Sequence, residues 1–230
     1  AANNKKALSL FTKATEIDPN YARAFAWKTC SLANNSEWFP EDMPDNWMED
    51  AFSSVNRAME IDPDDPEAHR ILGAVKLMFE GDMDKAIFHH KKAIEICPSD
   101  TFHLARYAVL LSYLGETDQA IEQLDRALRI NPFGSDLIFE TQGVCRYLQQ
   151  NYLGALDSFK NMQIDTRTSL FYSAASHKLL GNFDLSSEKL EIAKSESGMD
   201  IEKFVGTQLY QDPSIAKDLI TNLSEIEAVA

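Results

Sequence analysis

Side chains that commonly act as nucleophiles, general bases or metal ligands are few and widely spaced in this sequence. Its five histidines and three cysteines form no CxxC, HExxH or GxSxG pattern, so neither zinc binding nor acyl transfer is indicated. His89 and His90 are adjacent, and on a helix they would point in different directions, which favours one packed ring beside one solvated ring. Cys97 directly precedes Pro98 and is expected to be structural or partly exposed. The sequence therefore predicts no catalytic residue and no metal site.

Patterns for phosphate binding and for acid–base catalysis are also missing. There is no GxxxxGK[ST] or GxGxxG run, so no nucleotide or other cofactor is expected. Acidic runs such as EDMPDNWMED and DPDDPE arise readily in a chain with 36 acidic residues. They fall at expected turns and helix starts, where carboxylates cap helices and interact with water. We therefore predict that this chain is not an enzyme.

The overall charge limits the possible partners. The 22 basic and 36 acidic residues leave a formal net charge of −14, which repels nucleic acid and anionic lipid. A neutral or basic protein or peptide with apolar anchors is favoured instead. Three distant cysteines are typical of a reducing compartment, which predicts a cytoplasmic location. The longest apolar run, YAVLLSYL, is too short to span a bilayer.

A segment that recurs along the chain indicates how the elements are organised. It reads GETDQAIEQLDRALRINP at 115–132, and its copies place a small residue, a mostly large residue four positions later and a second small residue three further on. These spacings put all three columns on one helical face, where a second helix can approach closely. The first small column contains Ala7, Ala51, Ala86, Ala120, Ala155 and Ser186. The large column contains Phe11, Val55, His90, Leu124, Phe159 and Leu190, and the second small column contains Ala14, Ala58, Ala93, Ala127, Met162 and Ala193.

A second helix is expected between successive copies. Proline ends the first four copies, because it lacks an amide donor: Pro19, Pro63, Pro98 and Pro132. The second helix often ends at a glycine, as at Gly81, Gly115 and Gly181. A small residue recurs near its middle: Thr29, Gly73, Ala108, Gly143 and Ala174. The unit is therefore helix, turn, helix, and the first small column recurs after 34 or 35 residues between Ala51 and Ala155.

These columns resemble the tetratricopeptide repeat (TPR) family, most closely in the copies that end at Pro63, Pro98 and Pro132. The resemblance implies an all-α fold, a right-handed TPR superhelix (an α-solenoid) of about six helix pairs with a C-terminal capping helix pair. We expect the array over residues 1–198, starting within a repeat and with a longer second repeat at 20–63, and the helical cap over 199–230. The long second repeat and the ending LYQDPSIAKDLITNL are further similar to the C-terminal TPR half of bacterial multidomain regulators.

The second repeat departs from the pattern in length. The gap between the small residue in the middle of its first helix, Thr29, and the first small column of its second helix, Ala51, is 22 residues. The same gap is twelve residues in the three copies whose first helix carries Ala108, Gly143 or Ala174. The additional stretch contains Trp38, Phe39 and Trp47. These aromatic side chains either pack onto the neighbouring helices, which is the favoured interpretation, or form an exposed contact for a partner.

The resemblance also implies that the first helix of each pair lines a concave groove. Positions 2, 5, 9 and 12 of these helices form one stripe. It contains Arg23, Ala26, Cys30, Ala33, Glu67, Arg70, Ala74, Leu77, Phe102, Ala105, Val109, Ser112, Leu137, Glu140, Val144, Tyr147, Thr168, Phe171, Ala175 and Lys178, with Tyr113 beside Ser112. The stripe is largely apolar and lacks the Lys and Asn with which some TPR proteins clamp a C-terminal carboxylate. The groove candidates are Arg70, Phe102, Tyr113, Tyr147 and Phe171, and each of them could alternatively pack inside the fold.

Two functions are compatible with these patterns. The first is a non-catalytic protein–protein interaction module that binds a peptide, a partner domain or its own N-terminal domain in the concave groove. The second is the regulatory half of an adenylate or guanylate cyclase, or of a winged-helix transcription regulator, which controls an N-terminal domain. Because the sequence begins without Met inside the first recurring segment, we expect a fragment of a larger bacterial regulatory protein.

Overall fold

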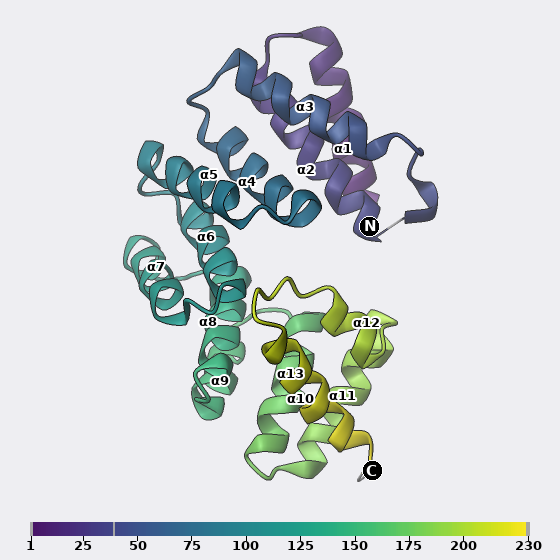
Figure 1. Ribbon diagram of the computed structural model, residues 1–230, viewed down its shortest axis with the longest axis vertical. Helices are drawn as coiled ribbons and strands as arrows, with labels where there is room; N and C mark the ends of the chain where they lie inside the picture. Colours follow the sequence, from purple (N-terminus) through teal and green to yellow (C-terminus); the bar gives the residue numbers. More distant parts are fainter. Residues whose placement is uncertain (1, 39, 229–230) are drawn as a thin grey trace. The chain divides into compact units, whose positions relative to one another are not determined.

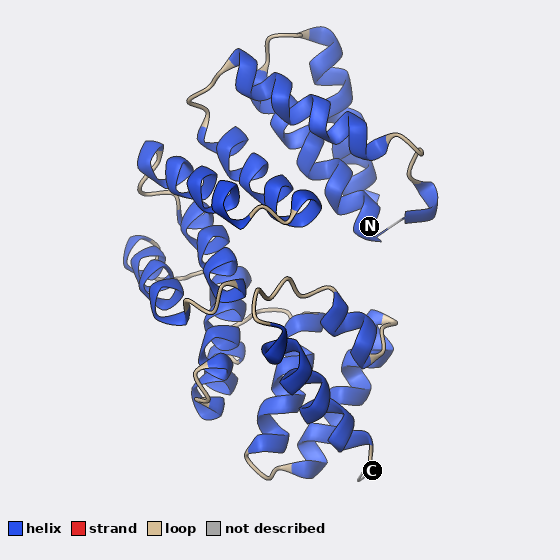
Figure 2. Cartoon of the chain, in the orientation of Figure 1, coloured by secondary structure: helices blue, strands red, loops and turns tan. Residues whose placement is uncertain are grey.

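A computed structural model describes residues 2–38 and 40–228, and most of these residues lie in helices. Figure 2 shows helices joined by loops and turns, and the described residues contain no strand. The all-α class predicted from the repeat spacing is therefore confirmed. The chain divides into two compact units, Ala1–His103 and Leu104–Ala230.

The first unit is a series of helices in which neighbours along the chain pack together. α1 packs against α2, α2 against α3, and α4 against α5, as Figure 1 shows. The helices are α1 (Ala2–Ile17), α2 (Ala22–Trp38), the 3-10 helix η1 (Pro40–Asp42), α3 (Trp47–Ile61), α4 (Pro66–Glu80) and α5 (Met83–Ile96). α6 (Thr101–Tyr113) starts at the end of this unit and continues into the next. The pairs α2–α3 and α4–α5 are the predicted helix–turn–helix repeats.

The second unit continues the pairing and ends in two further helices. Its helices after α6 are α7 (Thr117–Ile130), α8 (Asp136–Leu148), α9 (Tyr152–Phe159), α10 (Arg167–Leu179), α11 (Phe183–Ser197), α12 (Ile201–Gly206) and α13 (Pro213–Glu227). α8 packs against α7, α9 and α10, and α10 packs against α11. α13 contacts α10, α11 and α12, and Figure 1 shows it in yellow lying over α10 and α11.

The local sequence explains where the helices begin and end. At α4, Asp65 Oδ1 accepts a hydrogen bond from the amide of Ala68 at 2.8 Å, and proline occupies the first turn, where no amide donor is needed. The helix ends at Gly81, whose φ of +64° is readily adopted by a residue without a side chain. Asp212 and Pro213 repeat this start at α13.

The predicted columns of small residues form the contacts between paired helices. Seven alanines of these columns are completely buried: Ala58, Ala86, Ala93, Ala120, Ala127, Ala155 and Ala193. Two helices approach very closely at Gly143 of α8, where an added Cβ would lie 2.2 Å from the ring of Phe159 in α9. Glycine is required there because the interior is packed without spare volume.

The longer second repeat keeps the packing of the others. Thr29 Oγ1 of α2 donates a hydrogen bond to the carbonyl of Ala51 in α3 at 3.0 Å, across 22 residues of sequence. Ser186 Oγ of α11 donates to the carbonyl of Ala174 in α10 at 2.9 Å, across only twelve residues. The extra residues therefore lengthen the connection between α2 and α3 without removing the contact between the paired helices.

Trp47, the first residue of α3 and part of the aromatic stretch, packs onto a neighbouring helix. The ring of Trp47 meets that of Phe79 in α4 edge-on, with 5.6 Å between centroids. Trp47 thus follows the favoured interpretation of the aromatic stretch, in which its side chains pack onto neighbouring helices. The side chain of Trp38 and the whole of Phe39 lie outside the described residues.

Candidate peptide-binding surface

The groove candidates of the first unit lie on α4 and α6. Arg70 is only 2% exposed, and its guanidinium pairs with the Glu67 carboxylate at 2.7 Å. It also lies over the rings of Phe102, at 4.9 Å, and Trp27, at 5.4 Å. Arg70 is therefore packed inside the fold and does not line an open groove, which is the alternative given above for each groove candidate. Phe102 is 41% exposed and stays accessible to a partner.

A second contact of Glu67 orients a buried histidine. Glu67 Oε1 lies 3.1 Å from Nε2 of His103, which is 1% exposed. Burial raises the pKa of Glu67, but the hydrogen bond from His103 and the charge of Arg70 outweigh this effect and lower the pKa to about 2. Glu67 is therefore ionised at neutral pH and accepts hydrogen bonds from both neighbours.

The two adjacent histidines of α5 differ from the expectation of one packed and one solvated ring. His90 is buried, at 3% exposure, as expected. His89 is half-buried, and its Nδ1 lies 2.9 Å from Nδ1 of His69 in α4. The pKa of His89 is lowered to about 4, mainly because the ring is removed from water. His89 is therefore a neutral packing residue at physiological pH.

In the second unit, the C-terminal helices cover two of the groove candidates. Phe171 of α10 is completely buried, and its ring stacks on Phe204 of α12 with 4.1 Å between centroids. Tyr147 of α8 is 8% exposed, and Nδ2 of Asn222 in α13 donates to its hydroxyl at 3.3 Å. Phe171 and Tyr147 therefore belong to the core and do not line an open groove, because α12 and α13 pack on this face.

The residues that join α12 to α13, 207–212, lie against the same helices, and we call them the linker segment. The amide of Gln211 donates to the carbonyl of Tyr113, the last residue of α6, at 2.9 Å. The ring of Tyr210 meets that of Tyr113 edge-on at 5.5 Å, and its hydroxyl is hydrogen-bonded to that of Tyr172 in α10. The pKa of Tyr172 and that of Tyr210 are both raised by burial, so both phenols stay protonated. The linker segment thus contacts α6 and α10 as a bound peptide would, through one main-chain hydrogen bond and one aromatic anchor.

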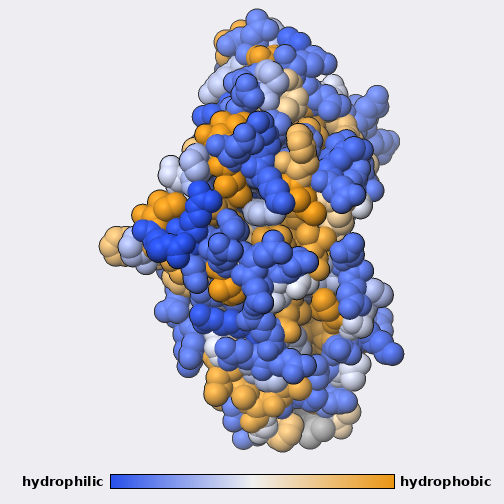
Figure 3. Space-filling view, turned by 60° about the vertical axis from the view of Figure 1, so that its left-hand side comes forward, coloured by the Kyte–Doolittle hydropathy of each residue, from blue (hydrophilic) through white to orange (hydrophobic). Residues whose placement is uncertain are grey.

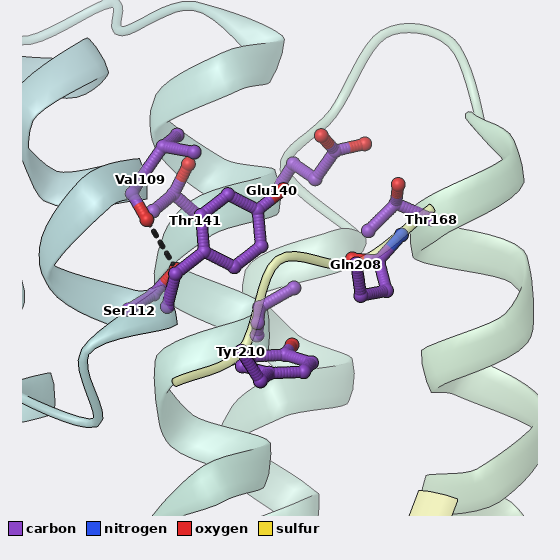
Figure 4. A pocket seen from close by; sticks show the side chains of 9 residues that line it. Val109, Ser112, Glu140, Thr141, Thr168, Gln208 and Tyr210 are labelled. Atoms are coloured by element: carbon purple, nitrogen blue, oxygen red, sulfur yellow. Dashed lines mark hydrogen bonds between the residues drawn. The ribbon is translucent and has the colours of Figure 1, made fainter. Parts of the chain in front are cut away.

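A cavity of about 50 Å³ adjoins the linker segment, and Figure 4 shows the side chains around it. Five residues of the predicted stripe line it, together with Tyr113 beside that stripe: Val109, Ser112, Glu140, Val144 and Thr168. The other lining residues are Thr141, Gln208 and Tyr210. Helical spacing alone thus indicates most of this lining, whereas Gln208 and Tyr210 lie in the linker segment, where no period applies.

Many of the side chains that line the cavity can form hydrogen bonds. Burial raises the pKa of Glu140, and a hydrogen bond from Thr166 Oγ1 to its carboxylate opposes this shift. Ser112 Oγ donates to the carbonyl of Val109 at 2.7 Å, drawn as the dashed line in Figure 4. The lining contains hydroxyl, amide and carboxyl groups and no cysteine or histidine, so the cavity suits a small polar side chain of a ligand.

Comparison with sequences of known proteins identifies one repeat. Residues 104–133, which comprise most of α6 together with α7, match the family model described as tetratricopeptide repeat. The SGT1 homolog protein of Bos taurus is 29% identical over 86 residues, which is 37% of this chain and 25% of that protein. The chain thus matches about a quarter of the length of this curated relative.

Solved structures share the fold over most of the chain. PilW, described as a type IV pilus biogenesis factor, has a TM-score of 0.64 at 16% identity, over 90% of both chains. The pilF protein of Pseudomonas aeruginosa has a TM-score of 0.62 at 17% identity, over 100% of this chain and 91% of that one. A TPR protein of Thermus thermophilus has a TM-score of 0.60 at 18% identity, over 86% of this chain and 97% of that one. The TPR architecture predicted from the repeat columns is confirmed.

The described residues offer no candidate for a membrane-spanning helix. None of their helices combines the necessary length with a sufficiently apolar composition. Figure 3 shows one face of the molecule, on which hydrophobic and hydrophilic residues are interspersed.

Proposed function

We propose that this chain, which has the fold of tetratricopeptide repeat proteins, is a non-catalytic protein–protein interaction module that binds a peptide or partner domain on the first helices of its pairs. The linker segment supports this proposal most directly. It lies on α6 and α10 through the ring of Tyr210 and the amide of Gln211. A face that holds a segment of its own chain in this way has the groups needed to hold a segment of another protein.

The partner that suits this face is a peptide with an aromatic anchor and a neutral to basic charge. Tyr113 offers an aromatic ring and a main-chain carbonyl, and Tyr172 offers a hydroxyl, which together match the apolar ring and polar tip of tyrosine. The net charge of −14 favours basic residues beside that anchor. On the first unit, the exposed ring of Phe102 offers a separate apolar contact.

The proposal is tested with a peptide that copies the linker segment. A fluorescein-labelled peptide of sequence TQLYQD is titrated with the wild-type chain and with Tyr210→Ala, and fluorescence anisotropy is measured. In the variant, the contacts of Tyr210 are absent, so the peptide supplies the missing tyrosine. We expect saturable binding to Tyr210→Ala that is at least tenfold tighter than binding to the wild type.

A control peptide separates recognition from non-specific association. The peptide TQLAQD lacks the aromatic anchor and is expected to bind Tyr210→Ala at least tenfold more weakly than TQLYQD. Far-UV circular dichroism of Tyr210→Ala establishes that the helices remain folded. Equal binding of both peptides, or no binding of TQLYQD to a folded variant, contradicts the assignment of this face as a peptide site.

A finer proposal is that the chain acts inside a larger bacterial regulatory protein. Its basis is the likeness of the long second repeat and of the C-terminal sequence to the TPR half of such regulators. The coding sequence upstream of this chain decides between the forms of this proposal. A nucleotide cyclase domain favours control of an enzyme, a winged helix favours control of transcription, and a short separate gene contradicts both.

A further inference from the structure

Three side chains that can ligate metal ions meet at the turn between α5 and α6. They are Cys97, which ends α5, Asp100, which precedes α6, and His103 in the first turn of α6. The Cys97 sulfur, an Asp100 carboxylate oxygen and a ring nitrogen of His103 all lie within 4.8 Å of one another. Asp100 Oδ1 accepts hydrogen bonds from the amides of Phe102, at 2.8 Å, and His103, at 3.1 Å, which holds the carboxylate in place. Cys97 and Asp100 are half-buried, so an ion can reach them from solvent.

The histidine of this cluster has a ring nitrogen that lacks a partner. His103 is 1% exposed, and its Nδ1 is buried without a hydrogen bond. Its other nitrogen, Nε2, lies 3.1 Å from Glu67 Oε1. With Nε2 directed at the Glu67 carboxylate, the tautomer that donates this hydrogen bond has its proton on Nε2 and leaves a lone pair on Nδ1. An unmatched acceptor in the interior is unfavourable unless something binds it.

We propose that Cys97, Asp100 and His103 form a binding site for a divalent zinc ion, which is bound by the Cys97 thiolate, an Asp100 carboxylate oxygen and His103 Nδ1. Thiolate, imidazole and carboxylate are the ligand types that zinc takes, with bonds of about 2.0 to 2.3 Å. A thiolate disfavours Mg²⁺ and Ca²⁺, which take oxygen ligands. Water completes a tetrahedral shell, since three protein ligands leave one position open.

Glu67 has the place of an outer carboxylate in this site. A metal-bound histidine usually donates its second ring N–H to a carboxylate, which orients the ring and makes the bound nitrogen more basic. The contact from His103 Nε2 to Glu67 supplies this, and Arg70 holds Glu67 in turn at 2.7 Å. The ion would thus connect the end of α5, the start of α6 and, through Glu67, α4.

The sequence of this turn also departs from the other proline turns of the array. The residue before proline is Asp18, Asp62 or Asn131 in the other copies and cysteine only before Pro98. A thiolate ligand is therefore available at one turn of the four. The spacing Cys-x-x-Asp-x-x-His matches none of the metal motifs sought in the sequence, which is why the sequence predicted no metal site.

The proposal is tested with cobalt as a spectroscopic substitute for zinc. The full chain is reduced, treated with a chelator, freed of chelator and titrated with Co²⁺. We expect a thiolate-to-cobalt charge-transfer band and visible d–d bands that saturate at one ion per chain, and their loss on addition of one equivalent of Zn²⁺. Wild-type protein that develops no charge-transfer band overturns the proposal.

Variants assign the ligands. Cys97→Ser is expected to abolish the charge-transfer band, whereas Cys30→Ser, the same change at a half-buried cysteine outside the cluster, is expected to keep it. Asp100→Asn keeps the ability to cap α6 and should weaken Zn²⁺ binding at least tenfold in isothermal titration calorimetry. Glu67→Gln should weaken it about 10- to 100-fold. A band that persists in Cys97→Ser, or unchanged zinc affinity in folded Asp100→Asn, refutes this ligand set.

Discussion

The contact between Phe204 and Phe171 provides a quantitative test of how the C-terminal helices close the second unit. Phe204 is completely buried, and its ring stacks on Phe171 at 4.1 Å and meets Tyr172 edge-on at 6.3 Å. Phe204→Ala removes the ring and leaves a cavity between α12 and α10. We expect the free energy of unfolding to fall by about 3 to 5 kcal/mol, as for other buried phenylalanines. The stacking geometry accounts for about 0.5 to 1.5 kcal/mol of that loss.

The measurement is equilibrium unfolding in urea, followed by far-UV circular dichroism. The matched control is Phe133→Ala, which removes the same ring from a position that is 91% exposed. It should change the free energy of unfolding by no more than about 0.5 kcal/mol. Amide hydrogen exchange adds a local readout, because loss of the Phe204 contact should speed exchange in α10 and α12 more than in α4.

A small effect would show that the reasoning about this contact is wrong. If Phe204→Ala lowers the free energy of unfolding by less than about 1 kcal/mol, the ring is not a packed core element. Equal exchange rates in α10 for wild type and variant would show that α12 does not hold that helix. Either result would also weaken the conclusion that Phe171 is covered by α12.

Further predictions concern helix contacts and pH. Gly143→Ala places a methyl group 2.2 Å from the Phe159 ring and should lower the free energy of unfolding by about 1 to 3 kcal/mol in the urea assay. The control Gly206→Ala adds a Cβ with no atom near it. It should leave the free energy of unfolding unchanged or raise it by up to about 1 kcal/mol. Because the pKa of His89 is about 4 in the fold against 6.5 when unperturbed, the unfolded chain binds more protons, and the free energy of unfolding should fall as pH decreases from 6.5 to 4. His89→Asn should remove this dependence, and a slope unchanged by the substitution would contradict it. The pKa of Glu67, lowered from 4.5 to about 2, gives stability that is present above pH 4.5 and lost as pH falls towards 2, so Glu67→Gln should flatten the stability profile in that lower range.

The helix pairs and the contacts between them can be predicted from local spacing in the sequence. Whether the inner stripe of the helices is open or covered cannot be predicted in this way. Columns four and three residues apart mark one helical face whatever surrounds it, so Ala120 and Leu124 are completely buried as predicted. The same spacing places Tyr147 and Phe171 on the inner stripe. Whether that stripe is open depends on α12 and α13, which lie far along the chain and obey no repeat.

For charged and polar residues, too, helical spacing does not reveal whether the side chain is accessible to a ligand. Arg70 has the spacing of a groove residue, but Glu67 lies three residues away and Phe102 is brought over it by the fold, so its guanidinium is paired and covered. The cavity beside Tyr113 could be anticipated only in part, since Tyr210 reaches it from the linker segment. Periodicity identifies positions on a face, and long-range contacts decide which of them a ligand can touch.

The long connection between α2 and α3 shows that a turn can be lengthened without changing the contacts between the helices that it joins. The hydrogen bond from Thr29 to Ala51 and the ion pair between Lys28 and Asp50, at 2.6 Å, belong to the helices themselves. Doubling a flexible loop costs only about 0.6 kcal/mol of closure entropy. An epitope or a small guest domain can therefore be spliced into this connection at little cost, and descendants of such a chain can gain new surface by growth of one turn while the helical scaffold is inherited intact.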